Sequence, residues 1–360
     1  MQYQLKQLLD TVVSSGGSDL HLHVDSPPAI RVSGHIQFIE GPSLTTTDTE
    51  GILKELINEQ QFETLESRGA IDFSFVHEGN AQFRTTAYKS RKHYDIVLRQ
   101  IPTKVYSMED LNLDVDVFIP LLKRTQGLIL VAGPTGSGKT TTLISMLDWI
   151  NHNLDRHILT IEQPIEFFHK ADKGLVSQRE VGIDANSFAE ALVDALREDP
   201  DVIMVGEMRD LATMESAVAA AETGHLVFAT LHTTGAANTV DRILGCFPPE
   251  ARDQVRTLLA ASLTAVISQQ LCHTIEGGVV PAYEIMIVDT AISALIRQAK
   301  THQLKTHIQT GKAQGMVTLD EYLSLLVKQG IIAEDEALRK AQDPKRVRAI
   351  LNDEAYTPED

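Results

Sequence analysis

One stretch, residues 127–150, constrains the fold more than any other part of the sequence. The apolar run "GLILVA" leads into the glycine-rich "GPTGSGK", and "TTTLISMLDWI" follows with apolar residues at helical spacing. A short apolar run, a glycine-rich turn and an amphipathic segment predict a buried strand, a tight loop and a helix. The pattern G-x-x-x-x-G-K-[ST] in this context is typical of a phosphate-binding loop.

The chemistry of such a loop needs each of its parts. Glycines let backbone N–H groups point at phosphate oxygens, and the N-terminus of the following helix attracts negative charge. Lys139 is expected to reach the β- and γ-phosphates, and the hydroxyl of Thr140 to bind Mg²⁺. The sequence therefore predicts ATP and Mg²⁺ as ligands. The residues expected to bind the nucleotide are Gly133, Pro134, Thr135, Gly136, Ser137, Gly138, Lys139, Thr140 and Thr141.

The second half of the chain has the pattern of an α/β domain. Continuous apolar runs that alternate with helical stretches are typical of a parallel sheet covered on both faces. Helices are expected to begin at Ser187, near Asp210 and at Thr318, and a glutamate follows Ser187 and Thr318 at capping-box spacing. Beyond residue 250 the pattern predicts mostly helix. The runs expected as parallel strands are 127–132, 157–161, 202–206 and 226–231.

Acids and a histidine follow the expected strands. Ligands of open parallel sheets bind at the carboxyl ends of the strands, where Glu162, Glu166, Glu207 and His232 are placed. Hydrolysis needs one carboxylate near the attacking water and another at the metal, for which Glu166 and Glu207 are candidates. Glu162 or Glu166 serving only in a salt bridge, and His232 only ending a strand, stay open alternatives. The odd separation of His225 and His232 speaks against a shared metal.

The first hundred residues have a different pattern. Short β-rich runs at 19–24, 29–39, 71–76, 81–88 and 94–101 surround one helical stretch, 47–67. We expect a small α+β domain over 1–101, an interdomain linker over 102–116 and the ATPase domain over 117–360.

Composition narrows the classes of function. The net charge of −17 speaks against a broad nucleic-acid surface. Cys246 and Cys272 have no spacing that predicts a disulfide framework or a zinc site. Because no apolar run reaches about 18 residues and the N-terminus lacks a signal-peptide pattern, the cytosol is the expected compartment.

Several segments together resemble a known family. "GPTGSGKTTT", "TIEQPIEF", "LREDPDVIMVGEMRD" and "AETGHLVFATLHTTGAANTVDRI" resemble the Walker A, Asp-box, Walker B and His-box segments of the type II/type IV secretion ATPases. "GGSDLHLHVDSPPAIRVSGHI" and "IQTGKAQGMVTLDEYLSLLVKQGII" are similar to the PilT branch, the pilus-retraction motors.

The resemblance implies a PAS-like N-terminal domain and a RecA-like C-terminal ATPase domain. It further implies a homohexamer at the cytoplasmic face of the inner membrane that drives twitching motility, with an inner-membrane pilus platform protein and a related accessory motor ATPase as partners. By position, Glu166 would be the general base and Glu207 the Walker B acid. Arg84 and Arg99 match arginines that reach the nucleotide from the N-terminal domain, and His232 belongs to the His box with His225.

Two segments depart from the family pattern. The Asp box usually reads E-D-P, and here Gln163 replaces the acid. The segment A-I-R-N-L-I-R-E, tied to retraction, is "AISALIRQ" (291–298), with Ser293 and Gln298 at the altered charged positions. An accessory or extension motor and a RecA-like nucleic-acid translocase are the alternative functions; the shortage of cysteines speaks against extension, and the net charge against translocation.

Overall fold

A computed structural model describes residues 3–32, 34–77, 81–101 and 104–353. The chain divides into two compact units. Unit 1 contains the chain up to Lys104 together with Glu162–His169 and Gln178–Asn186, and unit 2 contains Val105–Ile161, Lys170–Ser177 and the chain from Ser187.

Most of the segment expected as a linker belongs to unit 2. Residues 102 and 103 lie outside the described residues, and from Val105 the chain is part of unit 2. Met108, Leu111 and Leu113 are buried in the core of that unit.

Unit 1 is built on an antiparallel sheet with strand order β3-β2-β1-β6-β5-β4 among its described residues. Alternating apolar residues of the strands and one face of each helix form its core. The strands lie where the sequence predicts them. The elements are α1 (Leu5–Ser15), β1 (Asp19–Leu22), β2 (Ala29–Val32), β3 (His35–Phe38), α2 (Thr46–Leu56), α3 (Glu59–Arg68), β4 (Ala70–His77), β5 (Ala81–Ser90) and β6 (His93–Ile101).

The single helical stretch expected at 47–67 is two helices. Ile57 and Asn58 are extended, and Asn58 caps α3 by accepting a hydrogen bond from the backbone N–H of Gln61. The side chain of Gln61 returns a bond from the Asn58 N–H, which completes a capping box. Asparagine is a strong N-cap residue, and its local hydrogen bond starts a new helix at Glu59. The chain therefore forms two helices here, although its apolar residues keep helical spacing throughout.

Unit 2 is built on the predicted parallel sheet. The four expected strands pair in parallel in the order β7-β11-β10-β8, with Val205 opposite Ile161 and Ala229 opposite Val205. This confirms the α/β fold. In the described sheet the full order is β13-β12-β7-β11-β10-β8-β9. The strands are β7 (Gly127–Ala132), β8 (His157–Glu162), β9 (Leu175–Glu180), β10 (Val202–Val205), β11 (Leu226–Leu231), β12 (Leu263–His273) and β13 (Val279–Ile287).

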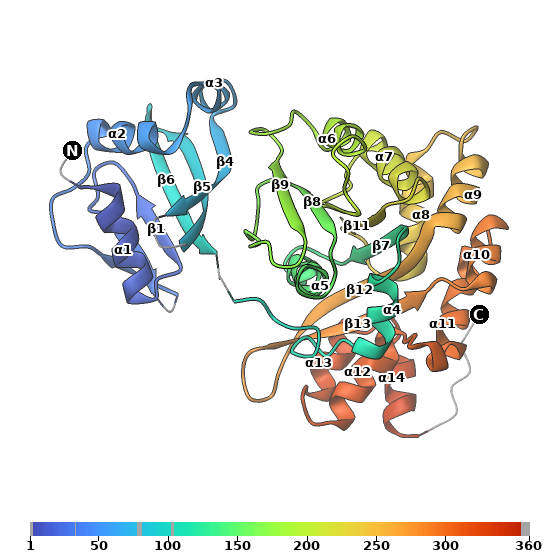
Figure 1. Cartoon of the computed structure of the whole chain (residues 1–360). Coiled ribbons are helices and arrows are strands. Elements are labelled where there is room, and N and C mark those ends of the chain that lie inside the picture. Colours follow the sequence, from blue (N-terminus) through green and yellow to red (C-terminus); the bar gives the residue numbers. More distant parts are fainter. Residues whose placement is uncertain (1–2, 33, 78–80, 102–103, 354–360) are drawn as a thin grey trace. The chain divides into compact units, whose positions relative to one another are not determined.

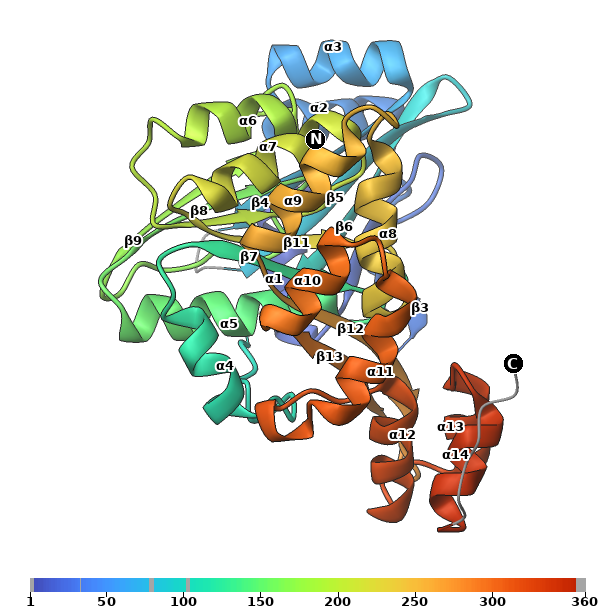
Figure 2. The same cartoon turned by 90° about the vertical axis from the view of Figure 1, so that its right-hand side faces the viewer.

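Helices cover both faces of this sheet. Figures 1 and 2 show α5 (Lys139–Asn153) on one face and α6 (Phe188–Ala195) and α7 (Leu211–Glu222) on the other. α4 (Val115–Leu122) shares a buried cluster with α5 and the strands. The burial of both faces explains why these strands are continuous apolar runs without polar alternation.

The region beyond residue 250 differs from the expected mostly helical structure. β12 pairs in parallel with β7 and antiparallel with β13, so it lies inside the sheet. Both of its faces are buried, and its sequence therefore lacks the alternation that distinguishes a strand from a helix. The remaining elements are α8 (Ala236–Cys246), α9 (Arg252–Ser262), α10 (Thr290–Arg297), η1 (Thr301–Gln303), α11 (Leu304–Thr310), η2 (Lys312–Gln314), α12 (Leu319–Lys328), α13 (Glu334–Lys340) and α14 (Pro344–Leu351).

Three predicted helix starts are confirmed. Ser187, Asp210 and Thr318 are N-caps whose side chains accept backbone N–H bonds from the first turns of α6, α7 and α12. Thr318 and Glu321 form the predicted capping box.

Within the described ranges, no helix has both the length and the apolar character that crossing a bilayer requires.

Candidate active site

The phosphate loop joins β7 to α5 in a backbone conformation that needs glycine. Gly133 has φ +152°, and a Cβ there would lie 2.4 Å from the carbonyl oxygen of Gln269 and 2.5 Å from the Ser137 hydroxyl. Gly138 is the N-cap of α5 with φ +86°, in the left-handed region. A side chain at Gly133 would therefore displace neighbouring backbone, and one at Gly138 would be strained.

Lys139 begins α5 with its amine directed back at the loop. The side chain is buried, and Nζ donates to the carbonyl oxygens of Gly133 at 2.9 Å and Pro134 at 3.0 Å. In the described part of the chain no side chain forms a capping hydrogen bond to α5, so its first turn is suited to bind an anion. Thr140 and Thr141 are half-buried in the same turn. A phosphate group would be suited by these three features together: the fixed amine of Lys139, the backbone of the glycine-rich loop and the start of α5.

Gln269 of β12 is a site residue that sequence reasoning missed. Its Oε1 accepts a bond of 2.8 Å from Thr142 Oγ1, and its Nε2 donates to the Ser137 carbonyl oxygen at 2.6 Å. The side chain is 1% exposed and holds the phosphate loop to α5 from the neighbouring strand. The sequence carries no motif for it, because its role depends on β12 lying beside β7.

Glu207, after β10, lies in a charged cluster beside the loop. Its Oε2 is 2.6 Å from Nη2 of Arg209, and its Oε1 is 3.1 Å from Nε2 of His232. The other ring nitrogen of His232 lies 3.4 Å from the hydroxyl of Thr135 in the phosphate loop. Strand ends β10 and β11 and the phosphate loop therefore meet at one edge of the sheet, as the parallel topology requires.

The charge of Glu207 is stabilised by its neighbours. Burial raises the pKa of this carboxyl, but the hydrogen bond and charge of Arg209 and the proximity of His232 outweigh burial and hold the pKa below its ordinary value. Glu207 is consequently an ionised carboxylate at neutral pH, the form in which it would bind a hard cation.

The two acids of "EQPIE" have different surroundings in unit 1. Glu162 ends β8 and is 4% exposed, and its carboxylate accepts the backbone N–H of Glu166 at 3.1 Å and the side-chain amide of Gln178 at 3.2 Å. It thereby shapes the turn, in which the Gln163–Pro164 peptide is cis. Glu166 has a side chain 44% exposed, with Oε1 3.8 Å from Nη1 of Arg84. The first acid is engaged in the turn, and the second is accessible.

Arg84 and Arg99 lie directly opposite each other on β5 and β6. Arg99 donates from Nε to Oδ1 of Asp19 at 2.8 Å, and 70% of its side chain is exposed. Asp19 is buried, which raises its pKa, but hydrogen bonds from Arg99 and Ser18 bring the pKa below the ordinary value. Both arginines belong to one face of the N-terminal sheet.

His225 is not part of the cluster at the carboxyl edge. It precedes β11, whereas His232 follows it, and its Nδ1 lies 3.0 Å from the carbonyl oxygen of Ala220. The structure therefore separates the two His-box histidines by the length of the strand.

Comparison with known proteins places this chain in a family. The family model described as type II/IV secretion system protein matches residues 3–346. The chain belongs to this family. It is 48% identical over 341 residues to the type IV pilus retraction ATPase PilT of Pseudomonas aeruginosa, covering 95% of this chain and 99% of that protein.

A second relative and one solved structure are also similar to this chain. The type IV pilus ATPase PilU of Pseudomonas aeruginosa is 36% identical, with coverage of 97% of this chain and 91% of PilU. The crystal structure of the pilus retraction motor PilT with bound ADP superimposes with a TM-score of 0.87 at 44% identity, covering 95% of this chain and 98% of that chain. The similarity spans both units, so the fold is that of this family of ATPases throughout.

The two departures from the family pattern have definite places in the fold. Gln163 is exposed in the turn before Pro164. Ser293 lies on α10, and its hydroxyl donates to the carbonyl oxygen of Ala260 on α9 at 2.7 Å. Gln298 is the exposed C-cap residue of α10. The serine thus anchors α10 to α9.

Proposed function

We propose that this ATPase couples ATP hydrolysis to retraction of a type IV pilus and so to twitching motility. The observation that carries the proposal is the cluster of Glu207, His232 and Thr135 around the phosphate loop, in a chain similar to a pilus-retraction ATPase over almost its whole length. The identity to PilT exceeds that to PilU, which favours the retraction motor over the accessory motor.

In this proposal, unit 2 binds the nucleotide. Lys139 and the N–H groups of the loop hold the phosphates, and Thr140 and Glu207 hold Mg²⁺. Mg²⁺ in such sites is bound through one or two carboxylates or hydroxyls together with substrate phosphates and water. An ionised Glu207 and a hydroxyl in the first turn of α5 fit that requirement. The bound cation would neutralise charge on the phosphates.

Hydrolysis is assigned to groups that remain accessible. Glu166 serves as the general base because its carboxylate is exposed, whereas that of Glu162 is occupied by the turn. Arg84 and Arg99 stabilise the charge of the transition state, a role that an arginine supplied from another domain fulfils in many nucleotide hydrolases. His232 senses the phosphate end of the nucleotide through its position between Glu207 and Thr135.

The assembly and location follow from the proposed activity. The chain acts as a homohexamer at the cytoplasmic face of the inner membrane, where it works on a pilus platform protein and cooperates with a related accessory motor ATPase. The similarity to PilU supports the existence of paired motors of this kind.

Replacing Glu166 by Gln tests the assignment of the general base. We expect kcat to fall by about 10²–10⁴-fold, with nucleotide affinity changed little, because the base acts only in the chemical step. Glu250→Gln, an exposed change before α9, is the matched control. Steady-state ATPase assays and titration with ADP provide both quantities. Normal turnover in the Glu166 variant would remove this residue as the base.

Deletion of the gene tests the biological role. Cells that retain pili but no longer move would support retraction, whereas loss of pili would support extension. Stimulation of ATPase activity by single-stranded DNA would instead favour the nucleic-acid translocase, which the net charge of −17 disfavours.

A further inference from the structure

Helix α8 begins without a cap of its own. Its N-cap residue is Gly235, which has no side chain to accept the first backbone N–H groups. Two strand residues supply the acceptors: Gly235 N–H donates to Ser268 Oγ at 2.8 Å, and Ala236 N–H donates to Glu284 Oε1 at 2.7 Å. Ser268 and Glu284 are direct partners across β12 and β13. The hairpin missed by sequence reasoning therefore caps α8.

The capped end of α8 is continuous with the nucleotide edge. Gly235 is three residues after His232, and the hydroxyl groups of Thr233 and Thr239 lie 2.7 Å apart, which ties the intervening loop to the first turn of the helix. Thr239 Oγ1 also bonds to the Gly235 carbonyl oxygen at 2.8 Å. The position of the His232 loop thus depends on where the start of α8 is held.

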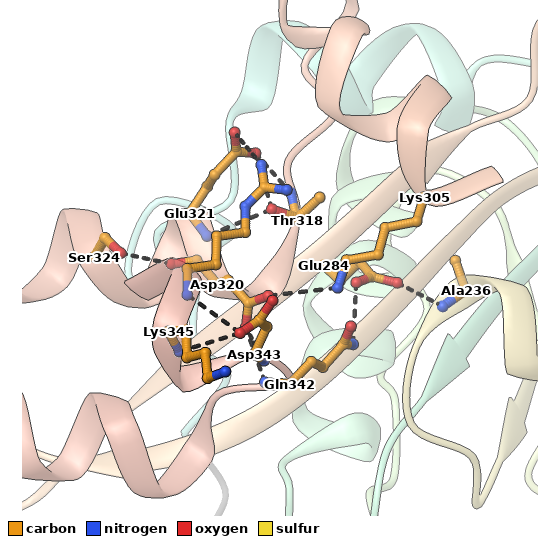
Figure 3. A network of polar contacts seen from close by, with 11 residues as sticks. Ala236, Glu284, Lys305, Thr318, Asp320, Glu321, Ser324, Gln342, Asp343 and Lys345 are labelled. Carbon is orange, nitrogen blue, oxygen red and sulfur yellow. Dashed lines mark hydrogen bonds and ion pairs between the residues drawn. The ribbon is translucent and has the colours of Figure 1, made fainter. Parts of the chain in front are cut away.

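Glu284 connects this helix start to the C-terminal helices. Its second oxygen, Oε2, accepts a bond of 3.1 Å from Nε2 of Gln342, in the segment between α13 and α14. Figure 3 shows the carboxylate of Glu284 with Ala236 on one side and Gln342 on the other. The side chain is 4% exposed. One buried carboxylate therefore contacts two elements that are far apart in the sequence.

Asp320 at the start of α12 fixes the same segment. Its Oδ1 accepts the backbone N–H groups of Gln342 at 2.8 Å and Asp343 at 3.2 Å, and its Oδ2 lies 3.5 Å from Nζ of Lys305 (Figure 3). Asp320 is fully buried. Gln342 is consequently held by its backbone to α12 and by its side chain to Glu284.

The space for this network comes from the glycine at the helix start. A Cβ at Gly235 would lie 3.2 Å from Gln342 Nε2 and 3.5 Å from Glu284 Oε1. Gly235 also has φ +88°, so a residue with a side chain at this position would be strained as well as crowd the link to Gln342. The carboxylate that caps α8 thus also binds the segment between α13 and α14.

We propose that Glu284 is a positioning residue for ATP hydrolysis: by holding Ala236 and Gln342 together, it makes the placement of His232 depend on α12–α14. The inference rests on the proposed role of His232 at the nucleotide. The C-terminal helices act on the site through α8, and a change that loosens Gln342 weakens the hold on the His232 loop.

The test is a double-mutant cycle between Glu284 and His232 in the full-length protein. We expect Glu284→Ala to lower kcat about tenfold or more while KM for ATP changes less than about threefold, because the phosphate loop is untouched. In the His232→Ala variant, adding Glu284→Ala should lower kcat by a further factor of less than about two. The effects of residues that act as one unit are not additive. A merely structural role would give the same factor in both backgrounds.

Gln342→Ala provides the second variant, because this side chain is exposed and its removal leaves the bond between Glu284 and Ala236 in place. We expect it to lower kcat about threefold at unchanged KM, again only where His232 is present. Arg348→Ala, an exposed change on α14, is the control. Thermal unfolding and the stoichiometry of ADP binding show whether each variant is folded.

The proposal would be overturned if Glu284→Ala lowered kcat by the same factor with and without His232. A rise in KM for ATP without loss of kcat would also overturn it. If Glu284→Ala does not fold, the Gln342 and His232 cycle decides by the same criterion. Absence of ATPase activity in the unaltered protein would refute the proposed function instead, so the two failures are distinguishable.

Discussion

Two polar clusters of unit 2 differ in how their charges are stabilised. Glu207 has a side chain 19% exposed, and its partners are the side chains of His232 and Arg209, which are 41% and 68% exposed. Glu284 and Asp320 are buried, and both accept bonds from backbone N–H groups. The first cluster is open to solvent and the second is closed.

This difference in exposure suits the two clusters to different roles: the open cluster to binding, and the closed cluster to positioning. Side chains such as Arg209 can turn away from Glu207 and be replaced by a cation or a phosphate at small cost, because water solvates the released charge. The backbone N–H of Ala236 is buried, and without Glu284 it would stay unpaired unless the start of α8 moved. The open cluster is therefore suited to exchange partners during catalysis, and the closed one to hold helices in place.

Among the changes in unit 2, the largest effect is expected at the open edge. Lys139→Ala should reduce kcat/KM for ATP by about 10²–10³-fold, because it removes the fixed positive charge that we propose to bind the phosphates. Steady-state ATPase assays give the ratio. Lys300→Ala, an exposed lysine after α10, should leave activity unchanged. A Lys139 variant with normal activity would show that the phosphate loop is not the nucleotide site.

Substitutions in the closed cluster of Glu284 and Asp320 should mainly lower the free energy of unfolding. Asp320→Ala removes the acceptor that the Gln342 and Asp343 N–H groups share with Lys305. We expect the free energy of unfolding of unit 2 to fall by about 1–3 kcal/mol, because hydrogen bonds are lost while water can solvate the charge of Lys305, whose side chain is 39% exposed. Asp320→Asn keeps one acceptor oxygen and should lose less. Urea titration can be followed by the single tryptophan, Trp149, which lies on α5 in this unit.

An exposed ion pair near this network is the control for the stability measurement. Lys312→Ala removes the contact of Lys312 with Glu321, in which the lysine side chain is 66% exposed, and it should cost less than about 1 kcal/mol. If Asp320→Ala costs no more than Lys312→Ala, the contrast between closed and open charges is wrong.

The smallest effect is expected at Arg209. Arg209→Ala removes the hydrogen bond and charge that lower the pKa of Glu207, so this pKa should rise. Because the ionised carboxylate is the active form, the acid limb of the pH–kcat profile should move to higher pH. At neutral pH kcat should stay within about threefold, because 68% of the Arg209 side chain is exposed and water weakens its interaction with Glu207. A limb that moves to lower pH would contradict the assignment; Arg242→Ala on α8 is the control.

Local signals in the sequence predicted one of these regions and not the other. The phosphate loop and the four parallel strands depend on neighbouring residues: a glycine pattern between a strand and a helix, and apolar runs long enough to be buried. The caps at Ser187, Asp210 and Thr318 are also local, since each acceptor bonds to its own first turn. The acid and histidine at the strand ends followed from topology, because parallel strands end at one edge.

The sequence by itself determined the α/β core, the phosphate loop and the carboxyl edge that Glu207 and His232 share, because short-range chemistry specifies each of them. Only the tertiary structure decided the roles of β12 and β13. Their residues are buried on both faces, so no periodicity marks them as strands, and Gln269 and Glu284 act on partners more than 45 residues away in the chain. A buried carboxylate capping a distant helix has no local pattern, since its acceptor and donor meet only after the sheet has formed.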